Sequence, residues 1–145
     1  MGMIDVGKKR VTKRTAKAKA VVRTGKDIIR RIKENRIAKG DVLEHARISG
    51  IMAAKKTSDI IPLCHPLPLD HVEVSFEVFK DSVVVNTMVT ARTRTGVEME
   101  AMTAASCAAL TIYDLCKMYG KGIEIKDVCL LYKSGGRTGV FKRKD

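Results

Sequence analysis

All three prolines of this 145-residue chain lie within residues 61–69, and His65 stands directly before the second of them, Pro66. Each proline fixes its own φ at about −65° and disfavours the α region for the residue before it. We therefore expect a stiff, extended segment that is not part of a helix interior. Such a loop can present an imidazole to a ligand, although a rigid connection with a merely hydrogen-bonded histidine is the simpler explanation of this stretch alone.

The composition indicates one folded domain over residues 1–145, with ends at 1–12 and 134–145 that we expect to be mobile. Hydrophobic residues make up 45% of the chain, enough for a core of its own. No apolar run reaches the length of a membrane span, and no signal-peptide pattern opens the chain, so we expect a cytoplasmic protein. The cysteines lack CxxC spacing, which favours reduced, buried thiols over disulfides or a zinc site.

The positive charge is concentrated at one end of the sequence. Residues 1–40 hold 14 lysines and arginines against three acidic residues, so they carry nearly all of the net charge of +12. Such a field attracts polyanions, such as nucleic acid, anionic lipid or a small polyphosphate, although a solvated basic arm has the same signature. Aromatic residues form only 4% of the chain, so side chains that stack on single-stranded bases are scarce.

Alternation of apolar and polar residues predicts β-strands. It is clearest after the proline segment, where Val72, Val74, Phe76 and Val78 alternate with residues of the opposite face. A short polar turn then leads into a second strand, which indicates a hairpin. The predicted strands cover residues 13–23, 71–79, 83–91 and 123–133.

Pairs of residues with the spacing of a capping box predict helix starts. The helices that they open are expected to end near residues 36, 56 and 119. The pairs are Thr24 with Asp27, Asp41 with Glu44, and Thr95 with Glu98.

The resulting order is β, two helices, β, β, α, β. When the helix pair is counted as one crossover, this order predicts the split β-α-β, ferredoxin-like arrangement. The expected fold class is α+β, with an antiparallel sheet and helices packed on one face. This architecture hosts many functions, so the function must be argued from the site.

The last predicted helix carries the strongest chemical candidates. Asp114 and Lys117 are three residues apart and share a helical face with mostly apolar neighbours. A carboxylate and an ammonium in such surroundings shift each other's pKa and can exchange protons with a substrate. A surface ion pair worth about 0.2–0.5 kcal/mol is the commoner meaning of the same spacing.

Glu98 and Glu100 lie at the start of the same helix, where acidic residues commonly complement the helix dipole, so Glu98 requires no function. Glu100 precedes Asp114 by about 20 Å along a continuous helix. If both residues act in one small-molecule site, a second subunit must complete that site. This predicts a symmetric oligomer with interfacial pockets.

Two further basic positions are candidates for phosphate binding. Lys39 ends one predicted helix just before another begins, where phosphate binding and helix-dipole complementation are equally good explanations. Lys133 and Arg137 flank a glycine pair after the last strand. The GxxxxGK[ST] pattern of a P-loop is absent, so this signal is weak when taken alone.

Five sequence words, in this order and spacing, resemble the family of molybdenum cofactor biosynthesis protein C (MoaC), the cyclic pyranopterin monophosphate synthases. The resemblance covers almost the whole chain, from about Met3 to Gly139. Each word is weak alone, but five in register are highly specific. The words are KGDV (39–42), IPLCHPL (61–67), TGVEMEA (95–101), LTIYDLCK (110–117) and KSGG (133–136).

The resemblance implies a substrate, 3′,8-cyclo-7,8-dihydro-GTP, that a radical-SAM enzyme makes. The implied lyase reaction opens the purine, rebuilds it as a pterin, closes a cyclic phosphate and releases pyrophosphate. The resemblance also implies a ferredoxin-like fold that assembles as a homohexamer of three dimers, with sites at the dimer interfaces. We expect no resident cofactor or metal, although Mg²⁺ can accompany the triphosphate.

Matched residue by residue, the resemblance implies that Asp114 is the catalytic aspartate and Lys117 its partner. Lys39 and His65 complete the implied catalytic set. Repeated proton transfers require such acid–base groups, and the loss of pyrophosphate requires cations. The implied substrate-binding residues are Leu63, Cys64, His65, Met99, Glu100, Arg14 and Lys133, of which Arg14 and Lys133 face the triphosphate.

Two other functions fit parts of the pattern. A basic nucleic-acid-binding module would use residues 8–36 on backbone phosphates, and its affinity would fall steeply with salt. A ligand-sensing ferredoxin-like domain would bind a small molecule without catalysis and would not require Asp114 and Lys117.

Overall fold

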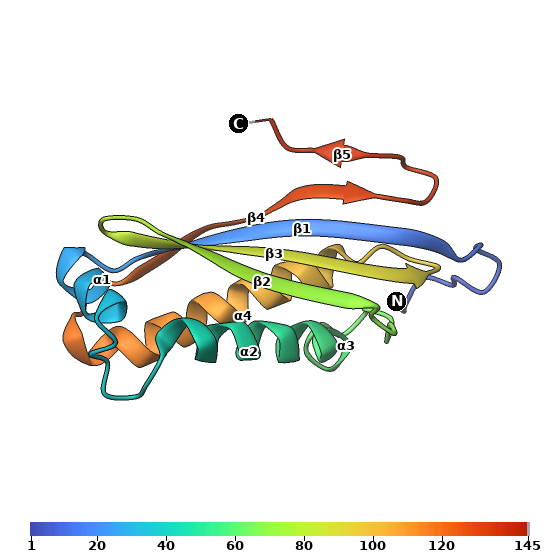
Figure 1. Cartoon of the computed structure of the whole chain (residues 1–145). Helices are drawn as coiled ribbons and strands as arrows, with labels where there is room; N and C mark the ends of the chain where they lie inside the picture. The colour runs from blue at the N-terminus through green and yellow to red at the C-terminus, as the bar shows by residue number, and fades with distance from the viewer. Residues whose placement is uncertain (145) are drawn as a thin grey trace.

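The computed structural model describes residues 1–144, which form one antiparallel sheet with helices packed against it. Figure 1 shows the two long helices, α2 and α4, crossing one face of the sheet. The helices are α1 (Lys26–Lys33), α2 (Val42–Lys55), α3 (Thr57–Ile60) and α4 (Glu98–Cys116), and the 3₁₀ turn η1 (Lys117–Tyr119) follows α4. The strands are β1 (Thr12–Arg23), β2 (His71–Val78), β3 (Ser82–Thr93), β4 (Glu124–Ser134) and β5 (Phe141–Lys142).

The strand order in the described sheet is β2-β3-β1-β4-β5, and neighbouring strands are antiparallel. The α+β fold with helices on one face is therefore confirmed, and β1 to β4 follow the predicted ferredoxin-like arrangement. The edge strand β5 was not predicted. It lies in the segment 134–145, whose expected mobility stays a prediction, and Asp145 lies outside the described residues.

Strand β1 shows why α4 can lie close to the sheet. Its inward residues are mostly alanines and are fully buried, while Lys17 and Lys19 lie on the opposite face, as the period of two requires. The hydroxyl of Thr87 donates to the carbonyl oxygen of Ala101 in α4 at 2.8 Å and lies 3.3 Å from that of Ala18 in β1. The small inward residues of β1 are Ala16, Ala18 and Ala20.

The two long helices pack tightly at Gly50 of α2. A Cβ atom at this position would lie 3.0 Å from Val74 of β2 and 3.1 Å from the carbonyl oxygen of Ala104 in α4. Contacts this short leave no room for a larger side chain, so Gly50 fixes how closely α2 approaches α4 and the sheet.

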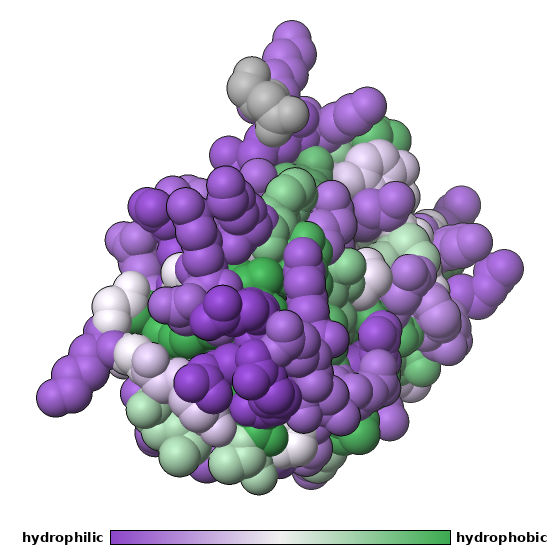
Figure 2. Space-filling view, turned by 60° about the vertical axis from the view of Figure 1, so that its left-hand side comes forward, coloured by the Kyte–Doolittle hydropathy of each residue, from purple (hydrophilic) through white to green (hydrophobic). Residues whose placement is uncertain are grey.

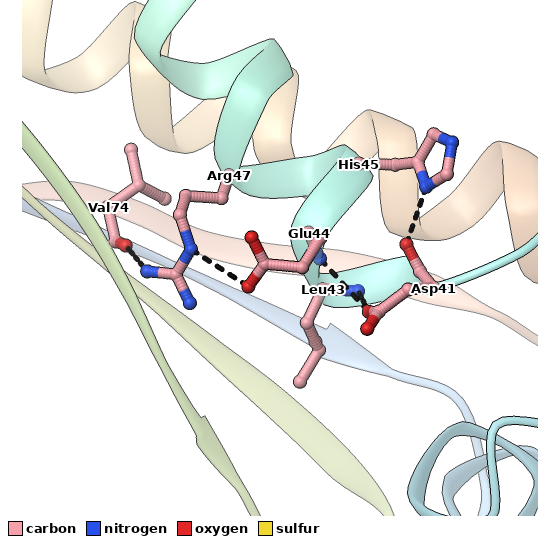
Figure 3. Close-up of polar contacts among 6 residues, drawn as sticks. All are labelled: Asp41, Leu43, Glu44, His45, Arg47 and Val74. Carbon is pink, nitrogen blue, oxygen red and sulfur yellow. Dashed lines mark hydrogen bonds and ion pairs between the residues drawn. The ribbon is translucent and has the colours of Figure 1, made fainter.

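The predicted start of α2 is confirmed. Figure 3 shows Asp41 at the N-cap, where its carboxylate accepts hydrogen bonds from the backbone N–H groups of Leu43 (3.0 Å) and Glu44 (3.1 Å). Glu44 does not close a capping box within the described structure but pairs with Arg47 at 3.2 Å. The Arg47 guanidinium also donates to the backbone carbonyl of Val74, which links α2 to β2.

The predicted capping pair Thr24 and Asp27 is wrong. The N-cap of α1 is Gly25 with φ of 85°, no side-chain cap bond is present there in the described chain, and Asp27 pairs with Arg30 instead. The backbone N–H groups of Thr24 and Gly25 both donate to the carbonyl of Asp81 in the β2–β3 turn. The chain must turn sharply from β1 to reach that partner, and glycine adopts the required positive φ most readily.

Helix α1 also ends earlier than the predicted residue 36. Its last residue is Lys33, and the backbone takes a positive φ of 50° at Asn35. Asparagine is one of the few residues that tolerate this left-handed conformation, which ends the helix.

The third predicted capping pair, Thr95 and Glu98, is also wrong. The N-cap of α4 is Val97, without a side-chain cap bond in the described structure. The Thr95 carbonyl accepts a bond from the Thr93 hydroxyl at 2.6 Å, and Glu98 points to Lys133 of β4. Glu98 therefore forms an ion pair with a distant residue, Lys133, instead of a capping bond at the start of α4. The proline segment lies outside helices, as expected, between α3 and β2.

Candidate active site

Segments distant in the sequence meet at the start of α4 and line a cleft of about 340 Å³. We call it the loop cleft. The proline segment supplies Leu63, Cys64 and His65, and α4 supplies Met99 and Glu100. The structure thus brings together five of the residues that the resemblance implied as substrate-binding.

Glu100 is the most deeply buried charged residue of the loop cleft. Its side chain is 4% exposed, and burial raises its pKa, with a smaller contribution from the negative charge of Glu98. Burial and the charge of Glu100 also raise the pKa of the Cys64 thiol. At neutral pH, Cys64 is therefore a protonated, uncharged group at the wall of the cleft.

His65 is held by the N-terminal segment of the chain. Its Nε2 atom lies 2.8 Å from the carbonyl oxygen of Ile4. Because a carbonyl oxygen only accepts hydrogen bonds, Nε2 must carry a proton, and in the neutral form of the ring Nδ1 is then the acceptor. Ile4, Val6 and Lys9 also line the loop cleft, so we call residues 3–10 the N-terminal strap.

A second cleft of about 630 Å³ adjoins the first, and Lys9, Thr95, Gly96 and Glu98 line both. Glu98 is the one carboxylate among the described residues that line this second cleft, and it pairs with Lys133 at 2.9 Å. We call it the cationic cleft because lysines and arginines dominate its wall. These are Lys8, Lys9, Arg10, Arg14, Arg94, Lys133 and Arg137.

The remaining predicted residues lie at the other end of α4. Asp114 pairs with Lys117 at 2.7 Å, as their spacing predicted, and also with Lys39 at 2.8 Å. The hydrogen bonds from Lys117 and Lys39 lower the pKa of Asp114 to about 2, and the same contact raises the pKa of Lys117. We call this exposed group the Asp114 cluster.

The end of the molecule that carries the Asp114 cluster is largely hydrophilic (Figure 2). Figure 2 turns this end of the molecule forward and shows hydrophilic residues over most of the face. Tyr119 holds the backbone just before Lys39, because its hydroxyl accepts a hydrogen bond from the backbone N–H of Ala38 at 2.8 Å. One further cation reaches this region, since the Arg31 guanidinium of α1 lies 4.8 Å from the centre of the Tyr119 ring.

The predicted site residues therefore form two groups in one copy of the chain. Glu100 and Asp114 both lie in the continuous helix α4, so about 20 Å of helix separates them. The loop and cationic clefts adjoin each other at the start of α4, and the Asp114 cluster lies at its end.

Sequence reasoning missed several residues of the clefts. Glu98 was considered dispensable, yet it lies between the two clefts and binds Lys133. The excess charge of residues 1–40 did signal Lys8, Lys9 and Arg10, but only as a group. No pattern distinguished Arg94, which the β3–α4 connection carries to the cationic cleft.

Within residues 1–144, no group of three or more His, Cys, Asp and Glu side chains is placed to bind a metal ion. In the same residues, no helix combines the length and the apolar character that crossing a membrane requires.

Known proteins are similar to this chain over nearly its whole length. A model of the MoaC family matches residues 3–136. The cyclic pyranopterin monophosphate synthase of Geotalea uraniireducens is 51% identical over 145 residues, covering 99% of this chain and 91% of that protein. The enzyme of the same name from Pelobacter propionicus is 52% identical with the same coverage. Cyclic pyranopterin monophosphate synthase 1 of Mycobacterium tuberculosis is 51% identical over 142 residues, covering 97% of this chain and 84% of that protein.

Proposed function

The chain belongs to the MoaC family, as the five sequence words indicated, and we propose that it is a cyclic pyranopterin monophosphate synthase, a lyase of molybdenum cofactor biosynthesis. Its proposed substrate is 3′,8-cyclo-7,8-dihydro-GTP, supplied by a radical-SAM enzyme, and its products are the cyclic pyranopterin monophosphate and pyrophosphate. The observation that carries this proposal is the meeting of a cationic cleft with a second cleft that contains acid–base groups. The nucleic-acid-binding alternative finds no support in the comparisons.

The cationic cleft suits the triphosphate. Arg14 and Lys133 lie in its wall, together with cations of the N-terminal strap. Cations near a leaving pyrophosphate stabilise the charge that develops on it. The adjoining loop cleft would then hold the base and sugar against Met99, Glu100 and His65.

The carboxyl groups of Asp114 and Glu100 differ in how readily they take up a proton, so they can take different roles in proton transfer. Two ammonium groups keep Asp114 ionised, whereas burial favours the protonated form of Glu100. Carboxylates whose pKa values are moved in opposite directions commonly divide the acid and base roles of a reaction. We assign proton donation to the Glu100 end and a permanent negative charge to Asp114, paired with Lys117 and Lys39, because a pKa of about 2 makes this carboxylate a weak proton acceptor.

One copy of the chain does not bring these two ends together, so we propose that a neighbouring copy completes each site, in a homohexamer of three dimers. Apolar side chains on the outer face of the helix layer support subunit contacts. Ile48 and Met52, four residues apart on α2, are 57% and 60% exposed, and Leu110 of α4 is 57% exposed.

Two smaller proposals concern the surroundings of the enzyme. Within the described chain, all four cysteines are free thiols, which supports a reducing, cytoplasmic location. We also propose that any Mg²⁺ arrives with the triphosphate and that the protein holds no resident metal, because the cationic wall repels a free cation. Extensive chelation of the purified protein should then leave its fold and its affinity for pyrophosphate unchanged.

The test is incubation with 3′,8-cyclo-7,8-dihydro-GTP, followed by measurement of the pterin product and pyrophosphate. The wild type should release both in equal amounts. Asp114→Asn and Lys117→Ala should each lower turnover by about 100-fold or more while the fold stays intact. Asp59→Asn is the matched control, since Asp59 forms an exposed i,i+3 pair with Lys56 at 3.3 Å. Binding without turnover in the wild type would favour the ligand-sensing alternative.

A further inference from the structure

The glycine pair after β4 lies against Arg14 of the cationic cleft. Gly135 and Gly136 both have positive φ values, 98° and 74°. A Cβ atom at Gly136 would overlap Nη1 of Arg14 and lie 2.5 Å from Cζ, whereas a Cβ atom at Gly135 would overlap the backbone carbonyl of Lys13. The bare backbone at 136 therefore packs directly against the guanidinium, and the backbone at 135 against strand β1.

The guanidinium of Arg14 is only partly satisfied within the described chain. Nη2 donates to the carbonyl of Arg94 at 3.3 Å, while Nε is buried and has no partner among residues 1–144. An arginine side chain has many rotamers in water, so a group of this kind stays in one place only where its neighbours confine it. Here Gly136 confines it on one side and the Arg94 carbonyl holds it at another.

We propose that Gly136 is a positioning residue that fixes the Arg14 guanidinium at the wall of the cationic cleft, where Arg14 binds a phosphate group of the substrate. This inference rests on the proposed function, which places the triphosphate in that cleft. It also explains why the residue is glycine, since the position has a positive φ and a side chain there would displace the Arg14 guanidinium. An alanine at 136 would meet the far end of a flexible side chain, so Arg14 would move aside while the fold remains.

Gly139 provides a matched control. Its φ of 69° is close to that of Gly136, but a Cβ atom there has no neighbour within 4 Å in the described chain. Gly136→Ala and Gly139→Ala therefore share the backbone strain of a left-handed alanine and differ in the contact with Arg14. Gly135→Ala is less informative, because it forces backbone against backbone.

The experiment measures the binding of inorganic pyrophosphate to the assembled protein by calorimetry. Gly136→Ala and Arg14→Ala should each weaken binding by about 10-fold, the loss expected for one charge-assisted contact. The double variant should bind like Arg14→Ala to within about twofold, because the residue that Gly136 positions is already gone. Gly139→Ala should bind like the wild type, and guanosine should bind all the variants alike.

The outcomes separate this inference from the proposed function. If Arg14→Ala binds pyrophosphate normally, the triphosphate does not contact Arg14. The proposed triphosphate site at Arg14 and the positioning role of Gly136 would then both be wrong. If Arg14→Ala weakens binding but Gly136→Ala does not, or if the two losses multiply, the cleft stands and the positioning role of Gly136 is wrong. Thermal unfolding gives a second readout if Gly136→Ala folds poorly. Adding Arg14→Ala to Gly136→Ala should then raise the midpoint of thermal unfolding to that of Gly139→Ala. If the midpoint does not rise, the contact between Gly136 and Arg14 is not the cause of the lost stability and the inference is wrong.

Discussion

Asp114 and Glu100 lie on the same helix, but their surroundings move their pKa values in opposite directions. Ammonium groups surround Asp114 and lower its pKa to about 2, whereas burial raises the pKa of Glu100. The cause at Asp114 is hydrogen bonding in an exposed position, and the cause at Glu100 is the loss of water. The two carboxylates can therefore be tested separately by their responses to pH.

For Asp114, the lysine contacts should control titration. The double variant Lys39→Ala, Lys117→Ala should raise the pKa of Asp114 from about 2 toward the ordinary value of about 3.9. Because the folded-state pKa is lowered, the stabilising contribution of Asp114 is present above the unfolded-state pKa and is lost as the pH falls through about 2. Carboxyl-carbon NMR titration measures this directly. An unchanged midpoint in the double variant would show that the lysines are not the cause.

For Glu100, the pH dependence has the opposite sign. A raised folded-state pKa means that ionisation opposes folding, so stability declines as the pH rises above the unfolded value of about 4.3. Glu100→Gln removes this penalty and should increase the free energy of unfolding more at pH 8 than at pH 4, while it lowers turnover. Denaturant unfolding at both pH values measures the difference. Glu124→Gln, at an exposed carboxylate, is the control; equal effects of the two substitutions would contradict a buried, destabilised Glu100.

At the scale of elements, the N-terminal strap connects the two clefts. Ile4 accepts a hydrogen bond from His65, and Lys9 lines both clefts. Deletion of residues 1–6 should lower turnover by about 100-fold, the weak end of what a misplaced acid–base group costs. Deletion of residues 1–2 is the control, since a Cβ atom at Gly2 has no neighbour within 4 Å in the described chain.

The ring nitrogens of His65 provide the direct readout of the strap. Nitrogen-15 NMR should find the proton on Nε2 in the full chain and a mixture of tautomers after deletion of residues 1–6. His65→Ala should impair turnover more than it lowers the midpoint of thermal unfolding. If thermal stability collapses while turnover per folded molecule is normal, the proline segment and His65 have only a structural role.

Elements that depend on local pattern were predictable, and those that depend on tertiary partners were not. The alternation in β1 and the Asp41 cap follow from neighbouring residues, and both were predicted. The starts of α1 and α4 depend on distant groups, the Asp81 carbonyl and Lys133, which overrode the local capping signals. Strand β5 forms by pairing with β4 and has too few residues to show a period.

The candidate site divides in the same way. Asp114 and Lys117 were predictable as a pair because helical spacing alone brings them together. Their contact with Lys39, and the meeting of Cys64 with Glu100, depend on the packing of separate segments, so only the family resemblance indicated them. Glu98 was missed because an acidic residue at a helix start is ordinary.

At the scale of the whole molecule, the length of α4 decides how the site can be assembled. The helix spans Glu98–Cys116 without interruption and keeps Glu100 and Asp114 at opposite ends. A single copy therefore offers two half-sites. In a two-fold symmetric dimer, each copy can supply the Asp114 end to one site and the Glu100 end to the other.

Subunit complementation tests this most directly. Glu100→Gln and Asp114→Asn proteins, each inactive alone, are mixed in equal amounts under conditions that exchange subunits, and formation of the pterin product from 3′,8-cyclo-7,8-dihydro-GTP is measured. If sites are shared, half of the randomly formed dimers are mixed, and one of the two sites in each carries both wild-type residues, so activity should return to about one quarter of the wild-type level. Exchange must be demonstrated independently, for example by mass spectrometry of isotopically labelled subunits. No recovery despite complete exchange would place the whole active site within one chain and contradict a site shared between the two ends of α4.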